Sequence, residues 1–93
     1  MPVREFRKRY ISFTIDGNLT RKDMIRHLNR LGKEAGITLN LTVFEGDRGI
    51  VLVRHTEQNR AIEAMNSYEK LPIKTIRTSG TIKKAKASLS SLV

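Results

Sequence analysis

The sequence predicts an α+β sandwich in which a four-stranded antiparallel sheet carries two helices on one face and a further helix follows the last strand. Two observations predict this class. Apolar residues alternate with polar ones in several short segments, as is typical of half-buried strands. Between these segments apolar residues recur three and four positions apart, as is typical of amphipathic helices. The order strand, helix, strand, strand, helix, strand, with two right-handed crossovers, gives a ferredoxin-like fold.

The first strand is expected at residues 7–15, and the first helix runs from Thr20 to Gly36. Thr20 is the predicted N-cap, and Gly36 suits the left-handed conformation that often ends a helix. Gly32 lies inside the helical pattern, where glycine costs up to ~1 kcal/mol relative to alanine. We therefore expect the helix to end or kink there.

A central hairpin is expected between residues 37 and 55. Its first strand, residues 37–44, alternates apolar and polar side chains, and residues 45–49 form a tight connection with two glycines able to adopt positive φ. Its second strand, residues 50–55, begins with an unbroken apolar run. That run predicts a strand in the middle of the sheet.

The last three elements complete the pattern. Thr56 is the predicted N-cap of a second helix that ends near Tyr68, and a fourth strand follows at residues 73–78. Ile76 is the best core candidate of that strand. A terminal basic helix with a narrow apolar stripe is expected at residues 80–92.

The charge of the chain is concentrated at its two ends. The 93 residues predict one domain, residues 1–93, with a formal net charge of +9. Residues 1–10 carry four basic side chains against one acidic one, residues 70–93 carry six and no acidic one, and residues 11–69 carry eight of each. Such segregation favours a surface that binds a polyanion, and two flexible basic tails, the first at residues 1–9, are the alternative.

Composition and motifs argue against several other classes. Cysteine is absent, so the chain has no disulfide and no thiolate metal site. No apolar run is long enough to span a membrane, and the start of the chain leads into no signal-peptide core, so a cytoplasmic location is expected. His27 and His55 have no acidic pair at metal-ligand spacing, and neither a phosphate-binding loop of the NTPase type nor a nucleophile elbow occurs. No catalytic residue and no metal ligand is predicted.

Two known uses of this fold can be compared with the residues. An acylphosphatase-type enzyme needs a glycine-rich anion loop with an arginine after the first strand, and residues 16–20 do not supply one. An RRM-like fold that stacks RNA bases needs aromatic residues on its third strand, yet Arg48-Gly49 is followed at residues 50–53 by aliphatic residues alone. Tyr10 on the first strand is the one aromatic residue left that could stack on a base. Recognition of phosphates and shape fits better than base stacking.

Residues 79–86, Ser-Gly-Thr-Ile-Lys-Lys-Ala-Lys, combine a turn signal, a hydroxyl residue that opens a helix, and three lysines in the first turns. Cations there oppose the positive end of the helix dipole. A bound anion would favour them, because backbone N–H groups at a helix N-terminus suit phosphate. A solvated lysine face is the alternative.

Residues 7–15 and 79–86 resemble two motifs of ribonuclease P protein component 2, the small α/β subunit of archaeal and eukaryal ribonuclease P. The order of elements between them agrees, so the resemblance covers nearly the whole chain. The second motif is the more specific. The third strand departs from the family pattern, since Leu52 and Val53 stand where basic or polar residues are typical. Only Arg54 and His55 are left as RNA contacts from that strand.

The resemblance implies a non-catalytic subunit of an endoribonuclease. In such enzymes an RNA subunit uses Mg²⁺ to remove the 5′ leader from precursor tRNA, and protein subunits stabilise the active RNA. The implied partners are the ribonuclease P RNA, precursor tRNA indirectly, and a TIM-barrel-like protein subunit; the protein itself would bind no cofactor. The candidate RNA-binding residues in the two motifs are Arg7, Lys8, Arg9, Ser79, Gly80, Thr81, Lys83, Lys84 and Lys86. Tyr10 and Arg77 are added from the first and fourth strands, and Arg54 and His55 form a secondary pair.

Two alternatives stay open. One is a general RNA-binding or ribosome-associated module of the same fold. The other is a small-molecule regulatory domain whose sheets pair edge to edge in a dimer, which accounts poorly for the charged ends.

If the first and fourth strands are neighbours in an antiparallel sheet, residues 7–9 and 79–81 lie side by side.

Overall fold

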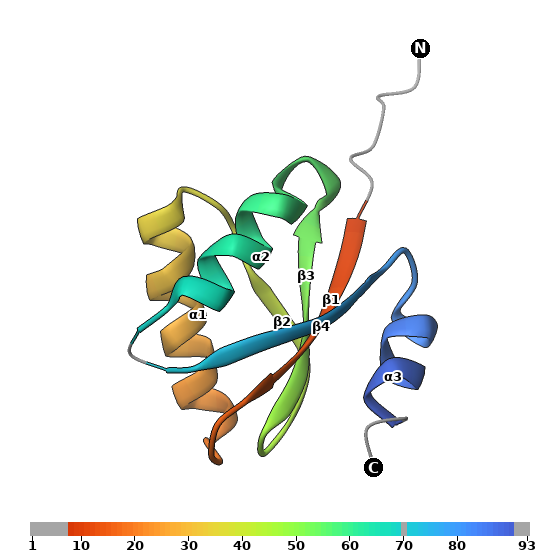
Figure 1. Ribbon diagram of the computed structural model, residues 1–93, viewed down its shortest axis with the longest axis horizontal. Helices are drawn as coiled ribbons and strands as arrows, with labels where there is room; N and C mark the ends of the chain where they lie inside the picture. The colour runs from red at the N-terminus through yellow and green to blue at the C-terminus, as the bar shows by residue number, and fades with distance from the viewer. Residues whose placement is uncertain (1–7, 70, 91–93) are drawn as a thin grey trace.

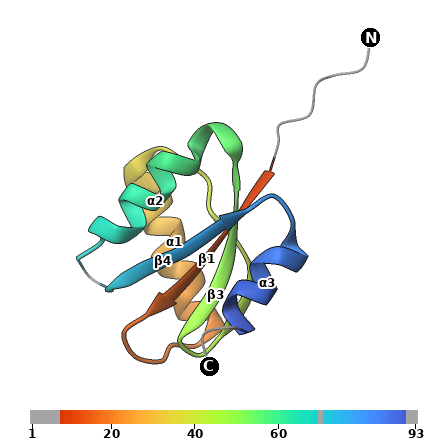
Figure 2. The ribbon, with the colours of Figure 1, turned by 45° about the vertical axis from the view of Figure 1, so that its right-hand side comes forward.

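The computed structural model describes residues 8–69 and 71–90 and shows a four-stranded antiparallel sheet with the strand order β2-β3-β1-β4. Helices α1 and α2 cover one face of the sheet, and α3 lies across the other (Figures 1 and 2). This confirms the predicted fold class. The elements are β1 Lys8–Ile15, α1 Arg21–Ala35, β2 Asn40–Glu45, β3 Arg48–Arg54, the 3₁₀ helix η1 His55–Glu57, α2 Gln58–Ser67, β4 Ile73–Ser79 and α3 Ile82–Ser90.

Helix α1 has both predicted ends but does not stop at Gly32. The Thr20 side chain accepts a hydrogen bond from the Asp23 N–H at 3.2 Å, and Gly36 closes the helix with a φ of 72°. Gly32 is buried, and a Cβ built on it would lie 2.7 Å from the Ile37 carbonyl oxygen. The Ile37 N–H also donates to the Gly32 carbonyl at 2.9 Å. Glycine therefore serves a close backbone approach here, and the predicted break was wrong.

Strand β2 begins later than expected, at Asn40, because residues 37–39 connect α1 to the sheet. The pairing with β3 shifts register between Leu41 and Val43, so Val43 pairs with Ile50 and packs on the α3 side. The hydroxyl of Thr42, at the shift, donates to the Ile50 carbonyl at 3.0 Å. The regular alternation predicted for residues 37–44 is therefore interrupted by a bulge.

The turn between β2 and β3 uses one of the two predicted glycines. Gly46 has a φ of 62°, whereas Gly49 is not among the glycines with positive φ and lies within β3. A Cβ on Gly49 would lie 2.6 Å from the Val43 carbonyl oxygen and 2.9 Å from Cζ of Phe13. The second glycine thus makes room for its neighbours in the sheet and does not form the turn.

Two further details of the second half differ from expectation. Thr56 lies inside η1, and α2 begins at Gln58 without a side-chain cap. In β4 the register against β1 shifts opposite Ser12 and Phe13, and Ile76 turns toward α3. Ile73 is the β4 residue that enters the main core. The prediction that Ile76 is the best core candidate of this strand was therefore wrong, because the bulge places Ile76 on the α3 side.

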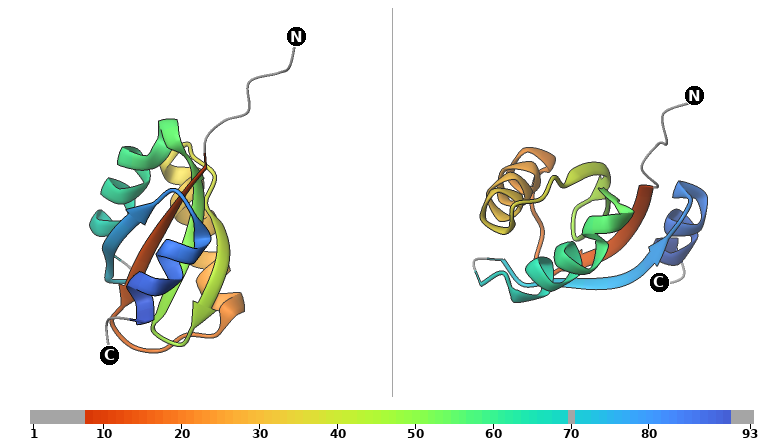
Figure 3. Two further views of the ribbon diagram at one scale, coloured as in Figure 1. Left: turned by 90° about the vertical axis from the view of Figure 1, so that its right-hand side faces the viewer. Right: turned by 90° about the horizontal axis from the view of Figure 1, so that it is seen from above.

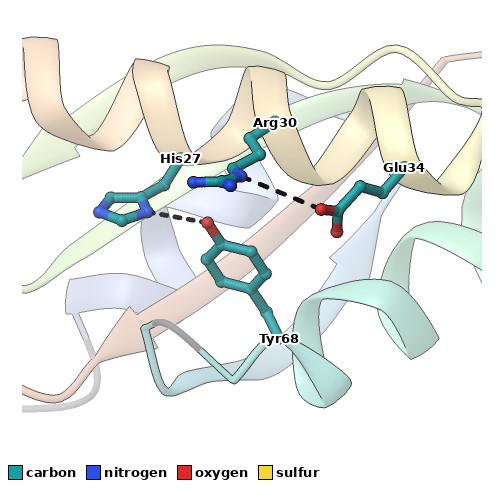
Figure 4. Close-up of polar contacts among 4 residues, drawn as sticks. All are labelled: His27, Arg30, Glu34 and Tyr68. Atoms are coloured by element: carbon teal, nitrogen blue, oxygen red, sulfur yellow. Dashed lines mark hydrogen bonds and ion pairs between the residues drawn. The ribbon is translucent and has the colours of Figure 1, made fainter.

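The main core lies between the sheet and the helices α1 and α2. Ile11 and Phe13 of β1 are completely buried in it, as are Met24 of α1 and Met65 of α2. The two helices are also joined by a polar contact, because Nδ1 of His27 and the hydroxyl of Tyr68 lie 2.9 Å apart (Figure 4). His27 is therefore a packing residue between the helices.

A second, smaller cluster holds α3 on the opposite face of the sheet. Ile50 and Ala85 are completely buried there, with Tyr10, Val43, Ile76 and Ile82 packed around them. The hydroxyl of Ser12 is buried and donates to the Ala85 carbonyl at 3.1 Å. Figure 3 shows α3 lying over the sheet face that α1 and α2 leave open.

The close contacts of Gly49 predict that Gly49→Ala destabilises the fold by about 1–3 kcal/mol, because the backbone oxygen of Val43 cannot rotate away from the new methyl group. Gly80→Ala is the matched control. The nearest atom to a Cβ there is Nη1 of Arg9 at 3.8 Å, so stability should stay within about 0.5 kcal/mol. Urea unfolding measures both; equal midpoints for the two variants would contradict the described packing.

Candidate nucleic-acid interface

Basic residues from three strands meet at one end of the sheet, where β1 begins and β3 and β4 end. The register places Lys8 opposite Arg54 and Tyr10 opposite Ser79. Nη1 of Arg9 donates to the Lys8 carbonyl at 3.2 Å and lies 3.8 Å from the position of a Cβ on Gly80. The predicted adjacency of the start of β1 and the end of β4 is therefore confirmed. Arg7 falls outside the described residues.

The start of α3 lies directly beside this group. The Thr81 hydroxyl accepts a hydrogen bond from the Lys84 N–H at 3.3 Å, and the Thr81 carbonyl accepts one from the Ala85 N–H at 3.2 Å. Thr81 thus caps the helix, as its position after the Ser-Gly turn predicted. The lysines Lys83, Lys84 and Lys86 are exposed, while Ala85 faces the sheet.

Three of the elements that build this surface carry charge of one sign, whereas η1, which supplies His55, also contains Glu57. Strands β1 and β4 and helix α3 together contain seven lysines and arginines and no aspartate or glutamate. Lys83 and Lys84 lie in the first turn of α3, where a cation opposes the helix dipole and no acidic residue offsets it. Both side chains are exposed.

Ser79 adds an unsatisfied hydrogen-bonding group at the same place. It is only 6% exposed, and its Oγ has no hydrogen-bond partner among residues 8–69 and 71–90. A buried hydroxyl without a partner costs about 1–3 kcal/mol. Ser79 is the last residue of β4 and directly precedes Gly80 and Thr81. Among the described residues Oε1 of Glu57 is the other buried side-chain atom without a partner, and Oγ of Ser79 is the one that lies next to Gly80 and Thr81.

The remaining candidates lie in different settings. Arg54 and His55, predicted as a secondary pair, lie at the same end of the sheet as Lys8, so the structure joins them to the primary group. Arg77 is exposed on β4, an edge strand. Tyr10 is half-buried against the α3 cluster, and its ring packs between protein side chains.

This position of Tyr10 and α3 decides what the surface can recognise. The sheet face on which an RRM-like fold stacks bases is covered here by α3. What remains accessible are guanidinium and ammonium groups and the amide groups at the start of α3. Such groups bind phosphate oxygens, and a row of them follows a nucleic-acid backbone without reading its bases.

Nothing in the described residues indicates a metal centre or a membrane span. No group of three or more histidine, cysteine, aspartate or glutamate side chains in residues 8–69 and 71–90 could hold a metal ion. Over the same ranges, no helix is both long and apolar enough to cross a membrane. A hollow of about 440 Å³ lies in the helical layer, lined by residues of α1 and α2 that include Glu34, and not at the basic end of the sheet.

Comparisons with known proteins support the fold. No protein-family model and no curated protein sequence matches the chain. Among solved structures, the fold is similar to that of a chain in the cryo-EM structure of yeast ribonuclease MRP, with a TM-score of 0.68. The match covers 97% of this chain and 92% of that chain at 12% sequence identity. At that identity the likeness shows a shared fold alone.

The unpaired hydroxyl of Ser79 predicts that Ser79→Ala leaves the free energy of unfolding unchanged or raises it by up to about 1 kcal/mol, because no hydrogen bond is lost. Ser12→Ala is the matched control. It removes the buried hydrogen bond to Ala85 and should lower stability by about 1 kcal/mol. Chemical denaturation of both variants measures the difference, and a destabilised Ser79→Ala would mean that its hydroxyl has a partner in the folded protein.

Proposed function

We propose that this protein is a non-catalytic, RNA-binding subunit of ribonuclease P that stabilises the catalytic RNA during removal of the 5′ leader from precursor tRNA. The observation that carries the proposal is the gathering of Lys8, Arg9, Arg54 and the capped, lysine-bearing start of α3 at one end of the sheet. The motif resemblance and the fold similarity to a chain of yeast ribonuclease MRP, an enzyme related to ribonuclease P, support it.

The surface offers two kinds of group that bind phosphate, side-chain cations and the backbone N–H groups at the start of α3. Arg9 presents a planar guanidinium that can hold two phosphate oxygens at once, and the lysines of α3 supply mobile positive charges. The first N–H groups of a helix have no partner within the helix. The Thr81 hydroxyl accepts a hydrogen bond from the N–H of Lys84, so the N–H groups of Ile82 and Lys83 are left to bind a phosphate. An RNA backbone that crosses from β1 to α3 meets both kinds in succession.

A phosphate-binding surface suits a structural role in a ribonucleoprotein. Folding an RNA brings phosphates close together, and their repulsion is reduced by Mg²⁺ or by protein cations. A protein that supplies such cations lowers the Mg²⁺ concentration that the folded RNA requires. In this proposal the catalytic Mg²⁺ is held by the RNA, and the protein neutralises backbone charge next to it. Precursor tRNA is reached through the RNA, and a TIM-barrel-like protein subunit is the proposed protein partner in the cytoplasm.

Reconstitution tests this role. The protein, its partner subunit and the ribonuclease P RNA are combined, and cleavage of precursor tRNA is followed as Mg²⁺ is lowered. We expect the wild-type chain to maintain cleavage at Mg²⁺ concentrations where the RNA alone is inactive. The double variant Arg9→Gln/Lys83→Gln removes two predicted phosphate contacts and should shift the requirement back toward that of the RNA alone. Its log–log salt slope of RNA binding should decrease by about 2.

The control variant is Arg60→Gln, which removes an exposed cation of α2 that is not one of the proposed RNA-binding residues. It should behave as the wild type in both assays. Absence of any rescue by the wild-type chain would contradict the ribonuclease P assignment. Retained RNA binding without rescue, with co-purification of ribosomal particles, would instead identify a general RNA-binding module.

A further inference from the structure

The solvent face of α1 carries a second row of basic side chains. Lys22, Arg26, Arg30 and Lys33 follow one another at steps of four, four and three residues, which places them on one face of the helix. All four are exposed, and the row spans about 16 Å at 1.5 Å per residue. The opposite side of α1 is the buried one, with Met24, Leu28 and Leu31 in the core.

Interactions within the helix do not explain this row. Lys22 and Arg26, and then Arg26 and Arg30, are like charges four residues apart, an arrangement that destabilises a helix. Lys22 also lies in the first turn, where it opposes the helix dipole. Arg30 has an acidic neighbour, but its Nε lies 3.9 Å from Glu34 and both side chains are more than half exposed (Figure 4). Of the four, only Lys33, in the last turn, is favoured by the dipole.

This row faces away from the surface already described. Helix α1 lies on one side of the sheet and α3 on the other, as the two views of Figure 3 show. Because the row is on the side of α1 opposite the core, it points outward from the helical layer. A phosphate backbone bound at the start of α3 is therefore out of its reach.

We propose that the solvent face of α1 is a second RNA-binding surface, so that one protein molecule holds two RNA segments on opposite sides of the domain. The inference rests on the proposed function in taking RNA as the ligand. The occupant follows from charge. The row offers four cations, and its acidic neighbours on the helix are Asp23 in the first turn and Glu34 beside Arg30. A protein partner would need an apolar centre, and Ile25 at 37% exposure is the one large exposed apolar side chain of the described residues beside the row. A duplex backbone presents a row of phosphates that the four cations match.

A bridging assay with short RNA duplexes tests the inference. Two duplexes of the same sequence, one with a donor and one with an acceptor dye, are mixed in excess over the protein. The wild type should produce energy transfer, with sedimentation showing two duplexes per protein. The variant Lys22→Gln/Arg26→Gln/Arg30→Gln should still bind one duplex, lose the energy transfer, and decrease the overall log–log salt slope by about 2 to 3. Glutamine keeps a similar helix propensity, so the fold should be retained.

The controls separate the two surfaces. Arg60→Gln, on α2, should bridge as the wild type does, and Arg9→Gln/Lys83→Gln should also lose energy transfer while keeping the α1 contribution to the salt slope. Unchanged energy transfer and an unchanged salt slope in the α1 variant would overturn the proposal that α1 binds RNA and leave the surface at the start of α3 intact. A defect of that variant confined to a polyglutamate probe would overturn it in favour of an acidic protein ligand. An unchanged affinity and salt slope in the Arg9→Gln/Lys83→Gln variant, with complete loss of binding in the α1 variant, would instead contradict the surface at the start of α3 on which the proposed function rests.

Discussion

Pairing between β1 and β4 determines where the charges of this protein lie. The two strands are far apart in the sequence, yet the antiparallel register places Tyr10 opposite Ser79. That single alignment brings Arg9 beside Gly80 and sets α3 to begin where β1 begins. Since β1 also pairs with β3, Arg54 arrives opposite Lys8 at the same end. The charges come from three separate parts of the chain, and the sheet alone makes them one surface.

The position of α3 then selects the kind of recognition. Its contact with the sheet is small, built around Ala85, Ile50 and the hydrogen bond from Ser12. This contact is enough for α3 to cover the centre of the sheet face, and Tyr10 packs in the same cluster as Ile50 and Ala85. A fold that could have offered aromatic side chains to bases therefore offers cations and helix amides to phosphates. This is a reason to expect affinity that depends on salt and little dependence on RNA sequence.

The order of elements and the main core could be predicted from the sequence because alternation and helical spacing are strong along most of the chain. The errors have a common physical origin. At Thr42 and at Ile76 a register shift turns the side chains to the other face, and nothing in the local pattern signals a bulge. Gly32 and Gly49 were interpreted through backbone freedom, whereas close backbone contacts explain both, since Gly32 makes room for the Ile37 carbonyl just after the helix and Gly49 for the Val43 carbonyl of β2.

For the site, the two basic motifs could be predicted and their adjacency followed from topology. That Arg54 lies opposite Lys8 could be learned only from the register of β3 against β1, which the structure gives. The buried, unpaired hydroxyl of Ser79 could not be predicted, because burial of one side chain depends on how α3 and β1 close over the end of β4. The same holds for Tyr10, whose sequence position suits stacking on RNA but whose surroundings in the fold are apolar protein side chains.

Backbone amide chemical shifts during titration with a short RNA duplex test the central claim most directly. We expect the amides of Lys8–Tyr10, of Arg54 and His55, and of Ser79–Lys84 to shift together as one site, while those of the second half of α2, residues 62–67, stay in place. Lack of perturbation at both the start of β1 and the start of α3, with binding mapped to α2 or to no described segment, would contradict it.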